Sequence, residues 1–470
     1  MPASSPFWQR ARRTLIGDRA FYRMVLAIVV PIIIQNAITN FVNLLDNVMV
    51  GRIGTDEMTG VSIVNQLLFV FNLCIFGGVS GAGIFAAQYH GAGDHEGVRN
   101  CFRFKLYLGL CLSAIAIALF AFASEPLIRL YLNEENAEAR IATTLGHGQD
   151  YLRIMLLGLP PFALSQAYAS TLRETGETAL PMRAGILAVL VNLSLNYVLI
   201  YGHFGFPRMG VRGAALATII SRYAELFVIA LATHRRPERF RFIRGAYRSG
   251  RVPMKLVRQI AVKGSPLLVN EALWSLGIAM IARCYSMRGL DVVSALNISN
   301  TVSNLFNTVF LSMGSATAII IGQALGANEI DRARDHVWKL AAFSVACCLM
   351  MGTLLCIASP FVPLLYNTED HIRHLATLLM IVNAVYSPLS GFANISYFTL
   401  RSGGKTIITF LFDSVFTWVV SYPTAYLLVT LTSLPIVWVV LMVQFMDIIK
   451  CVLGFILLKK GVWIHNMVVK

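Results

Sequence analysis

Twelve apolar stretches, each long enough to cross a bilayer as a helix of about 20 residues, follow one another along this chain. They lie near residues 24–47, 59–87, 103–123, 151–172, 179–202, 211–233, 260–285, 292–323, 337–365, 372–399, 406–431 and 434–458. A water-soluble domain is excluded, because 56% of the 470 residues are apolar and the mean hydropathy is +0.66. The pattern predicts an all-α polytopic membrane protein with twelve transmembrane helices.

The basic residues are distributed unevenly between the two sides of these spans. Of the 39 Lys and Arg residues, 28 lie at the chain ends or in even-numbered connections, and eight lie in odd-numbered connections. Since basic connections stay in the cytoplasm, we expect a multi-pass protein of the plasma (cytoplasmic) membrane with both termini cytoplasmic. This topology also accounts for the basic segment 235–263, so we expect membrane lipid, and no nucleic acid, as its partner.

The chain contains an internal repeat. A shift of 235 in the numbering aligns Pro31 with Pro266 and "QYHGAGD" with "QALGANE", and it gives 14 identities over the segment 31–99. A shift of 228 aligns "LRETGET" with "LRSGGKT". Because each half has an even number of spans, we predict two six-helix lobes related by a pseudo-two-fold axis along the membrane normal. The expected lobes are residues 1–233 and 260–470, joined by a basic cytoplasmic connection at 234–259.

An acid within the first span stands out, because an ionisable group in the hydrocarbon layer needs a partner or a role. Asp46 has no basic residue one turn away in either direction. It must therefore bind a cation from elsewhere, take up a proton, or lie in water. Asn192 and Asn196 on span 5 and Thr218 on span 6 are oxygen-bearing candidates for the same site, although such residues also join helices in any membrane bundle.

Other polar residues in the spans are secondary candidates for a substrate cavity. Glu271 and Asp413 have no opposite charge on their own helical face, and Arg283 is a possible partner for one of them across helices. Asp447 and Lys450, three residues apart, are expected to pair with each other. The remaining cavity candidates, both on span 1, are Gln35 and Asn43.

Enzyme motifs are absent from the sequence, which has no HExxH, P-loop or GxSxG, and its nine His are scattered. The eight Cys show no metal-ligand spacing. We therefore expect no enzymatic activity, no cofactor and no resident metal; at most, Na⁺ binds at Asp46, Asn192, Asn196 and Thr218.

Several segments together resemble the multidrug and toxic compound extrusion (MATE) family of transporters. They are "VPIIIQNAITNFVNLLDNVMVGRIG" (30–54), "QYHGAGD", "LRETGET", "NLSLNYVLIYG", "GVRGAALAT" and "GQALGANE", and the likeness extends from about residue 24 to residue 458. The resemblance implies two six-helix lobes with a cleft between them. It also implies alternating access and export of amphipathic, often cationic compounds in exchange for H⁺ or Na⁺.

The resemblance also suggests roles for particular residues. Asp46, fifteen residues after Pro31, stands where the family has its coupling acid. Asn192, Asn196 and Thr218 match the family's partners on the fifth and sixth helices, but the family has an Asp where this chain has Asn196. The missing negative charge leaves the choice between H⁺ and Na⁺ open.

A branch of the family instead uses a Glu on helix 7 and an Asp on helix 10. Glu271 is about one turn too close to Pro266 to match the first of these, and span 10 has no acid. We therefore place coupling in the N-terminal lobe.

These features lead us to expect a secondary active antiporter for multidrug or xenobiotic efflux, acting as a monomer on small amphipathic molecules. The alternative is a flippase for lipid-linked oligosaccharides with a related two-lobed fold. Such a flippase should line its cleft with several cations for pyrophosphate, and Arg283 is the one isolated basic residue deep in a span.

Overall fold

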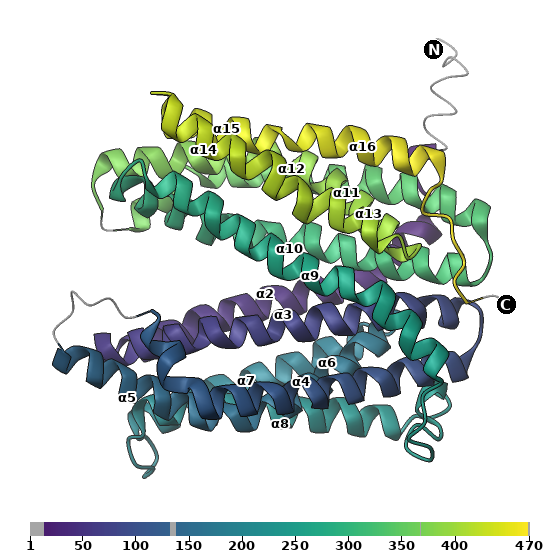
Figure 1. Ribbon diagram of the computed structural model, residues 1–470, viewed down its shortest axis with the longest axis horizontal. Helices are drawn as coiled ribbons and strands as arrows, with labels where there is room; N and C mark the ends of the chain where they lie inside the picture. Colours follow the sequence, from purple (N-terminus) through teal and green to yellow (C-terminus); the bar gives the residue numbers. More distant parts are fainter. Residues whose placement is uncertain (1–13, 132–137, 367, 469–470) are drawn as a thin grey trace. The chain divides into compact units, whose positions relative to one another are not determined.

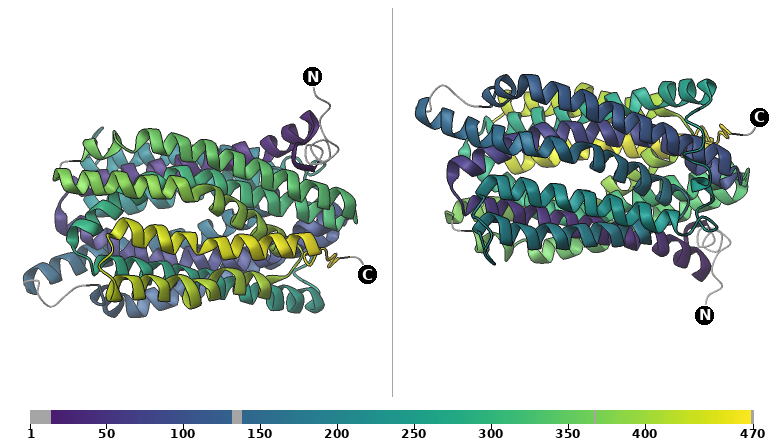
Figure 2. Two further views of the ribbon diagram at one scale, coloured as in Figure 1. Left: turned by 90° about the horizontal axis from the view of Figure 1, so that it is seen from above. Right: turned by 90° about the horizontal axis from the view of Figure 1, so that it is seen from below.

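The computed structural model describes residues 14–131, 138–366 and 368–468, and every regular element in these ranges is helical. The first half contains α2 (Arg19–Gly51), α3 (Thr55–Gly91), α4 (His95–Arg129), α5 (Glu138–Met155), η1 (Leu156–Gly158), α6 (Leu159–Glu174), α7 (Ala179–Tyr201) and α8 (Gly210–His234). A 3₁₀ turn, η2 (Arg241–Ile243), lies in the connection to the second half. Figures 1 and 2 show long helices lying side by side in each half.

The second half begins with α9 (Met254–Ser286), α10 (Leu290–Gly326), α11 (Ile330–Ala358), η3 (Val362–Leu365) and α12 (Asp370–Ser402). Its fifth span runs from α13 (Thr406–Phe410) through the π-helical segments η4 (Leu411–Val415) and η5 (Thr417–Ser421) to α14 (Tyr422–Leu431). Its sixth span consists of α15 (Ile436–Phe445) and α16 (Asp447–Lys460).

Eleven helical segments of the described residues are long and apolar enough to cross a membrane. The remaining expected span, near residues 151–172, is formed by the end of α5, η1 and α6. The 3₁₀ turn falls just before Pro160 and Pro161, which lack the N–H needed to continue an α-helix. The all-α polytopic fold is thus confirmed, and prolines explain why one span is interrupted.

The helix boundaries repeat with the sequence. The shift of 235 takes the bounds of α2 onto those of α9, both of 33 residues, and the same shift takes α3 onto α10, both of 37 residues. The fourth spans of the two halves follow the shorter shift of 228, which takes the end of α6 at Glu174 onto the end of α12 at Ser402. The two halves are therefore structural duplicates.

The repeated glycine motif has a physical basis in helix packing. Gly91 ends α3 and Gly326 ends α10. A Cβ at Gly91 would collide with the backbone carbonyl of Gln323, and a Cβ at Gly326 would collide with that of Gln88. The two helix ends thus approach each other reciprocally, and glycine is required because no side chain fits between the backbones.

The described chain packs as two compact units. One comprises the described residues of Met1–Ile33, Ala87–Gly93 and Val269–Lys470, and the other comprises the described residues of Ile34–Ala86 and Asp94–Leu268. The predicted lobe limits at residues 234–259 stay a prediction. Each unit has its own apolar core, for example around Ile321 and Leu340 in the first and around Val64 and Leu152 in the second.

Two helices pass from one unit to the other at equivalent positions. α2 changes unit after Ile33, and α9 does so after Leu268, which is the duplicate of Ile33 under the shift of 235. Each crossing lies two residues beyond a proline inside the helix, Pro31 or Pro266. Since proline removes one helical hydrogen bond and clashes with the preceding turn, both crossings occur where the helix is weakest.

Candidate functional site

Asp46 lies beside the amide groups that the sequence pairs with it. Asn192 and Asn196 are buried one turn apart on α7, and Asn196 Nδ2 donates to Asp46 Oδ1 at 2.6 Å. Thr218 on α8 lies 3.3 Å from Asn192 and also donates to the carbonyl of Ala214. The four predicted coupling residues are therefore neighbours within one unit, contributed by three helices.

The amide of Asn192 fits this site in two orientations. With Nδ2 turned toward Asp46, it donates to both carboxylate oxygens at 3.0 and 3.2 Å. With Oδ1 turned toward Asp46, that oxygen accepts from Asn196 Nδ2 at 3.2 Å, while Asn192 Nδ2 donates to Thr218 Oγ1 at 3.3 Å. The first orientation suits a bare carboxylate, and the second requires a proton or a cation between the facing oxygens.

The Asp46 carboxylate has amide donors but no countercharge among the described residues. Arg222, on the neighbouring α8, instead has its guanidinium carbon 4.6 Å from the centre of the Phe162 ring. Asn196 Oδ1 is buried and accepts no hydrogen bond from the part of the chain that the structure describes. The site therefore offers an uncompensated negative charge to an incoming proton or cation.

Gln35 lies on α2, like Asp46, but nearer the start of the helix. Its side chain lies against Gly185 of α7. Asp46 and Asn196 lie eleven residues further along their respective helices, which is about 16 Å. The side chain of Asn43, also expected near this site, lies outside the described residues.

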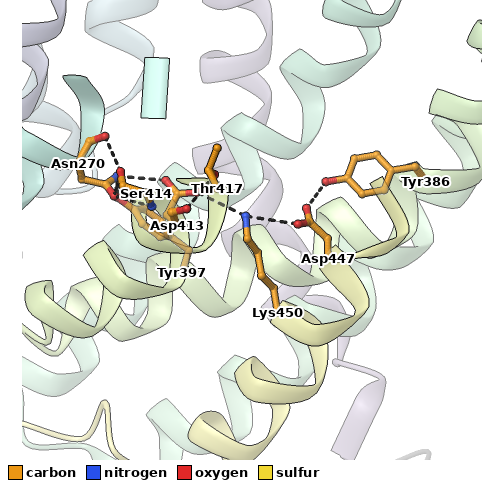
Figure 3. Close-up of polar contacts among 8 residues, drawn as sticks. All are labelled: Asn270, Tyr386, Tyr397, Asp413, Ser414, Thr417, Asp447 and Lys450. Atoms are coloured by element: carbon orange, nitrogen blue, oxygen red, sulfur yellow. Dashed lines mark hydrogen bonds and ion pairs between the residues drawn. The ribbon is translucent and has the colours of Figure 1, made fainter. Parts of the chain in front are cut away.

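A second polar cluster, in the other unit, is centred on Asp413 (Figure 3). Asn270 of α9 donates to Asp413 Oδ2 at 3.1 Å and to the Tyr397 hydroxyl at 3.3 Å. Ser414 lies 2.7 Å from Asn270 Oδ1 and 2.8 Å from its carbonyl oxygen. Asp413 and Ser414 lie in the π-helical segment η4, a geometry often found at functional positions of helices.

Lys450 provides the cation of this second cluster. Its Nζ lies 3.8 Å from Asp413 Oδ1 and 3.4 Å from Asp447 Oδ1, as the dashed lines in Figure 3 show. Tyr386 of α12 donates to the other carboxylate oxygen of Asp447, and the Phe416 ring centre lies 4.8 Å from Nζ. The Lys450 side chain is 10% exposed, so its charge is largely shielded from water beside two carboxylates. The expected pairing of Asp447 with Lys450 is confirmed.

The suggested role of Arg283 as a partner of Glu271 or Asp413 is wrong. Arg283 is exposed in the last turn of α9, and Glu271 lies twelve residues earlier on the same helix, about 18 Å away. Asp413 pairs with Lys450, and Glu271 interacts electrostatically with Arg401 of α12. The helix rise therefore rules out an Arg283–Glu271 pair.

Sequence reasoning missed four members of the second cluster: Asn270, Ser414, Tyr386 and Tyr397. The internal repeat could have indicated that Asn270 and Asp413 lie close together. Asn270 is the duplicate of Gln35 under the shift of 235. Asp413 is likewise the duplicate of Gly185 under the shift of 228, which aligns the fifth span of the second half with α7. The contact between Asn270 and Asp413 thus repeats the contact between Gln35 and Gly185.

The fold and these sites define a class: a polytopic helical membrane protein built from two duplicated six-span halves, each holding a partly buried acid in its spans. The MatE family model matches residues 31–198 and 266–427, which is more than half of the chain. The chain therefore belongs to the MatE family, and it is a MATE transporter.

Individual relatives agree with this membership. The chain is 26% identical over 421 residues to the "Probable multidrug resistance protein YoeA" of Bacillus subtilis, covering 89% of each chain. It is 24% identical to the "Probable multidrug resistance protein NorM" of Thermotoga maritima, covering 86% of this chain and 85% of that protein.

Solved structures show the same fold. A multidrug resistance MATE family transporter of the MOP superfamily in an outward-facing conformation superposes with a TM-score of 0.84 at 20% identity, covering 96% of this chain and 97% of that one. A MATE structure in the bent conformation also gives 0.84 at 20% identity, covering 95% of this chain and 96% of that one.

Proposed function

We propose that this protein is a secondary active antiporter that exports amphipathic or cationic small molecules across the cytoplasmic membrane. The exchanged ion is H⁺ or Na⁺, and it binds at Asp46. The observation that carries the proposal is a partly buried carboxylate faced by two amides, with no countercharge among the described residues. Relatives named as multidrug resistance proteins support the substrate class.

The two orientations of Asn192 supply a coupling step. When Asp46 is bare, Asn192 Nδ2 and Asn196 Nδ2 both donate to it. A proton or cation bound at Asp46 needs an oxygen acceptor beside it. Asn192 therefore turns its Oδ1 toward Asp46 and its Nδ2 toward Thr218. Ion binding at α2 is thereby transmitted to α7 and α8, because hydrogen bonds to both helices are exchanged.

A mechanical consequence follows for α2. Asp46 lies on the same helix as Pro31, and the helix changes compact unit shortly after that proline. Rearranged bonds at Asp46 alter the forces on the end of α2, and the helix yields most readily near Pro31. We propose that this bend exchanges the ion-bound and the substrate-bound states, which gives alternating access.

The oxygens around Asp46 are compatible with either ion. A proton needs one acceptor beside the carboxyl group, and Asn192 Oδ1 provides it. Sodium needs several oxygens, and the carboxylate of Asp46, Asn192 Oδ1 and Thr218 Oγ1 are candidates; Asn196 would have to turn its amide to add its Oδ1. The single negative charge favours the proton, because a second carboxylate would strengthen binding of a metal cation.

The test is accumulation of a fluorescent cationic dye in efflux-deficient bacteria expressing the wild type, Asp46→Asn or Asp413→Asn at matched membrane levels. External Na⁺ and pH are varied independently. We expect the wild type to lower dye accumulation and Asp46→Asn to match the empty vector. Asp413→Asn, which removes an acid from the other unit, should retain export.

The ion gradient on which wild-type export depends identifies the coupling ion. Equal export by the wild type and Asp46→Asn would contradict coupling at Asp46. Failure of the wild type to export any of a panel of amphipathic cations would contradict the proposed substrate class. The flippase alternative is not favoured, since the relatives reported above carry multidrug resistance names.

A further inference from the structure

The basic connection between α8 and α9 is a folded part of the protein. Its side chains Phe240, Phe242 and Ile243 are buried, and Phe242 packs edge-to-face on Phe102 of α4 with ring centres 5.4 Å apart. A hydrogen bond between the Tyr247 and Tyr168 hydroxyls joins the connection to α6 as well. Because apolar and aromatic contacts hold the segment in place, its arginines occupy defined positions.

A buried arginine of α4 fixes the second part of this connection. Arg103 Nε donates to the Ala246 carbonyl at 2.7 Å, and Nη2 donates to the Gly245 carbonyl at 2.6 Å. Nη1 donates to Asn100 Oδ1 at 3.1 Å. These acceptors are neutral, and Arg103 forms no ion pair with a carboxylate in the described ranges. Its charge therefore adds to the potential of the surface beside it.

That surface is an open hollow of about 1250 Å³ between the start of α4 and the connection. Five arginines and a single acid line it: Arg99, Arg103, Arg244, Arg248, Arg251 and Glu96. Arg244 pairs with Glu238, which lies outside the lining. The guanidinium groups of Arg248 and Arg251 are exposed and form no ion pair within the described residues. The hollow therefore carries an excess of positive charge.

We propose that this hollow, hereafter the arginine hollow, binds the phosphate of an anionic phospholipid headgroup. Guanidinium groups present paired N–H donors that match phosphate oxygens, and several of them converge here. Basic pockets at the membrane surface bind such headgroups in other membrane proteins. The general excess of basic residues on one side explains the charge of the connection, but it does not explain why the arginines converge on a hollow.

Its position favours a lipid over a soluble phosphate. The lining residue Pro253 directly precedes α9, and Arg99 and Arg103 lie in the first turns of α4, so the hollow lies at the ends of two spans. Tyr107, one turn beyond Arg103, is exposed and reaches toward Gly250 at the rim. Exposed tyrosines are typical of the headgroup level of a membrane, where a headgroup would meet the hollow.

Lipid retention by the full-length protein tests the proposal. Wild-type protein is reconstituted in phosphatidylcholine nanodiscs containing phosphatidylglycerol, and retained phosphatidylglycerol is counted by native mass spectrometry. The pocket variant is Arg248→Gln with Arg251→Gln. The control is Lys255→Gln with Arg258→Gln, which removes two exposed charges from the adjacent start of α9 but none from the hollow.

We expect the pocket variant to retain about tenfold less phosphatidylglycerol than the control variant, which should resemble the wild type. Equal retention by the two variants would overturn the proposal. A titration with inorganic phosphate separates the two sources of phosphate. If inorganic phosphate binds the wild type as tightly as phosphatidylglycerol does, the assignment to a lipid is overturned; much weaker binding supports it.

Discussion

The partly buried acids Asp46 and Asp413 lie on equivalent pairs of helices but have opposite electrostatic surroundings. Asp46 accepts hydrogen bonds from amides and has no countercharge among the described residues, whereas Asp413 has a lysine ammonium 3.8 Å away. The lysine also pairs with Asp447, so the second cluster holds its own cation. An acid without a built-in cation can exchange a mobile one, and an acid with a built-in cation is already neutralised. The comparison supports our proposal that ions exchange at Asp46, and it leads us to expect a structural role for Asp413.

Because the two halves are duplicates, the surroundings of Asp46 and Asp413 can be compared position by position. Under the shift of 228, Lys450 is the duplicate of Arg222, so both halves have a basic residue at the same place on their sixth span. Arg222 stacks on Phe162, while Lys450 reaches two carboxylates. The acids differ as well, because Asp46 lies about three turns beyond Gln35, the duplicate of Asn270. The two acids also lie on different members of the helix pair, Asp46 on α2 and Asp413 on the span that duplicates α7. An acid and the basic residue of the sixth span thus meet in the second half, where Asp413 pairs with Lys450.

The largest effect on stability is expected from removing the ammonium of Lys450 from the Asp413 cluster. Lys450→Met leaves two partly buried carboxylates without their shared ammonium, so the free energy of unfolding should fall by about 3 kcal/mol, the lower end of the cost for a buried pair. The measurement is thermal or denaturant unfolding of the purified protein in detergent. The double variant Lys450→Met with Asp413→Asn should recover part of the loss, because one uncompensated charge is gone.

An unchanged stability in Lys450→Met would show that the lysine does not neutralise the cluster. The variant also permits a second measurement. If the remaining carboxylates resemble Asp46 in needing a mobile cation, added Na⁺ should raise the melting temperature of the variant more than that of the wild type.

A second negative charge beside Asp46 should change how tightly that site binds a metal cation. Asn196→Asp introduces a second carboxylate 2.6 Å from the first at the position of the present hydrogen bond, which should strengthen binding of a metal cation by about tenfold. The measurement is the Na⁺ concentration for half-maximal dye export in proteoliposomes. Asn192→Asp adds a carboxylate to the same site from one turn away and should act in the same direction. No change in Na⁺ dependence for either variant would argue against a cation site here.

A smaller effect is expected from the hydroxyl that joins α9 to the π-helical segment. Ser414→Ala removes the hydrogen bond to Asn270 and should lower the free energy of unfolding by about 0.5–1.5 kcal/mol. Export should continue, because the Asp46 cluster lies in the other unit. Unfolding and dye export are measured on the same preparations. Loss of export at full stability would give the second cluster more than a structural role.

The smallest stability effect should come from Asp46→Asn. Since the carboxylate has no countercharge among the described residues, replacing it leaves no orphaned partner charge, and stability should change by less than about 1 kcal/mol. The same unfolding assay measures this change. A loss as large as that of Lys450→Met would reveal a structural ion pair at Asp46 and remove the contrast between the two acids.

The sequence predicts the parts of this protein that depend on hydrophobicity and repetition. The spans, the duplicated helix bounds and the neighbours of Asp46 follow from apolar runs, aligned prolines and paired asparagines. The cluster around Asp413 does not follow from such features. Asn270 and Ser414 are ordinary polar residues far apart in the sequence, and their contact depends on a π-helical turn that no local pattern indicates.

For Arg283, the sequence suggests an ion pair that the structure contradicts. Its charge in an apolar run attracts attention, but its distance along α9 keeps it from the acid that it was expected to serve. A helix fixes separations along its axis, so spacing within one helix is more reliable than the choice of partners across helices.

The passage of α2 and α9 between the compact units limits how the protein can move. The backbone passes between the units after Ile33, Ala86, Gly93 and Leu268, and these four linkages must absorb any relative displacement. Two of the linkages are helices with an internal proline at duplicate positions. Because a proline removes one helical hydrogen bond, a relative displacement of the units would bend both helices most readily at these two points.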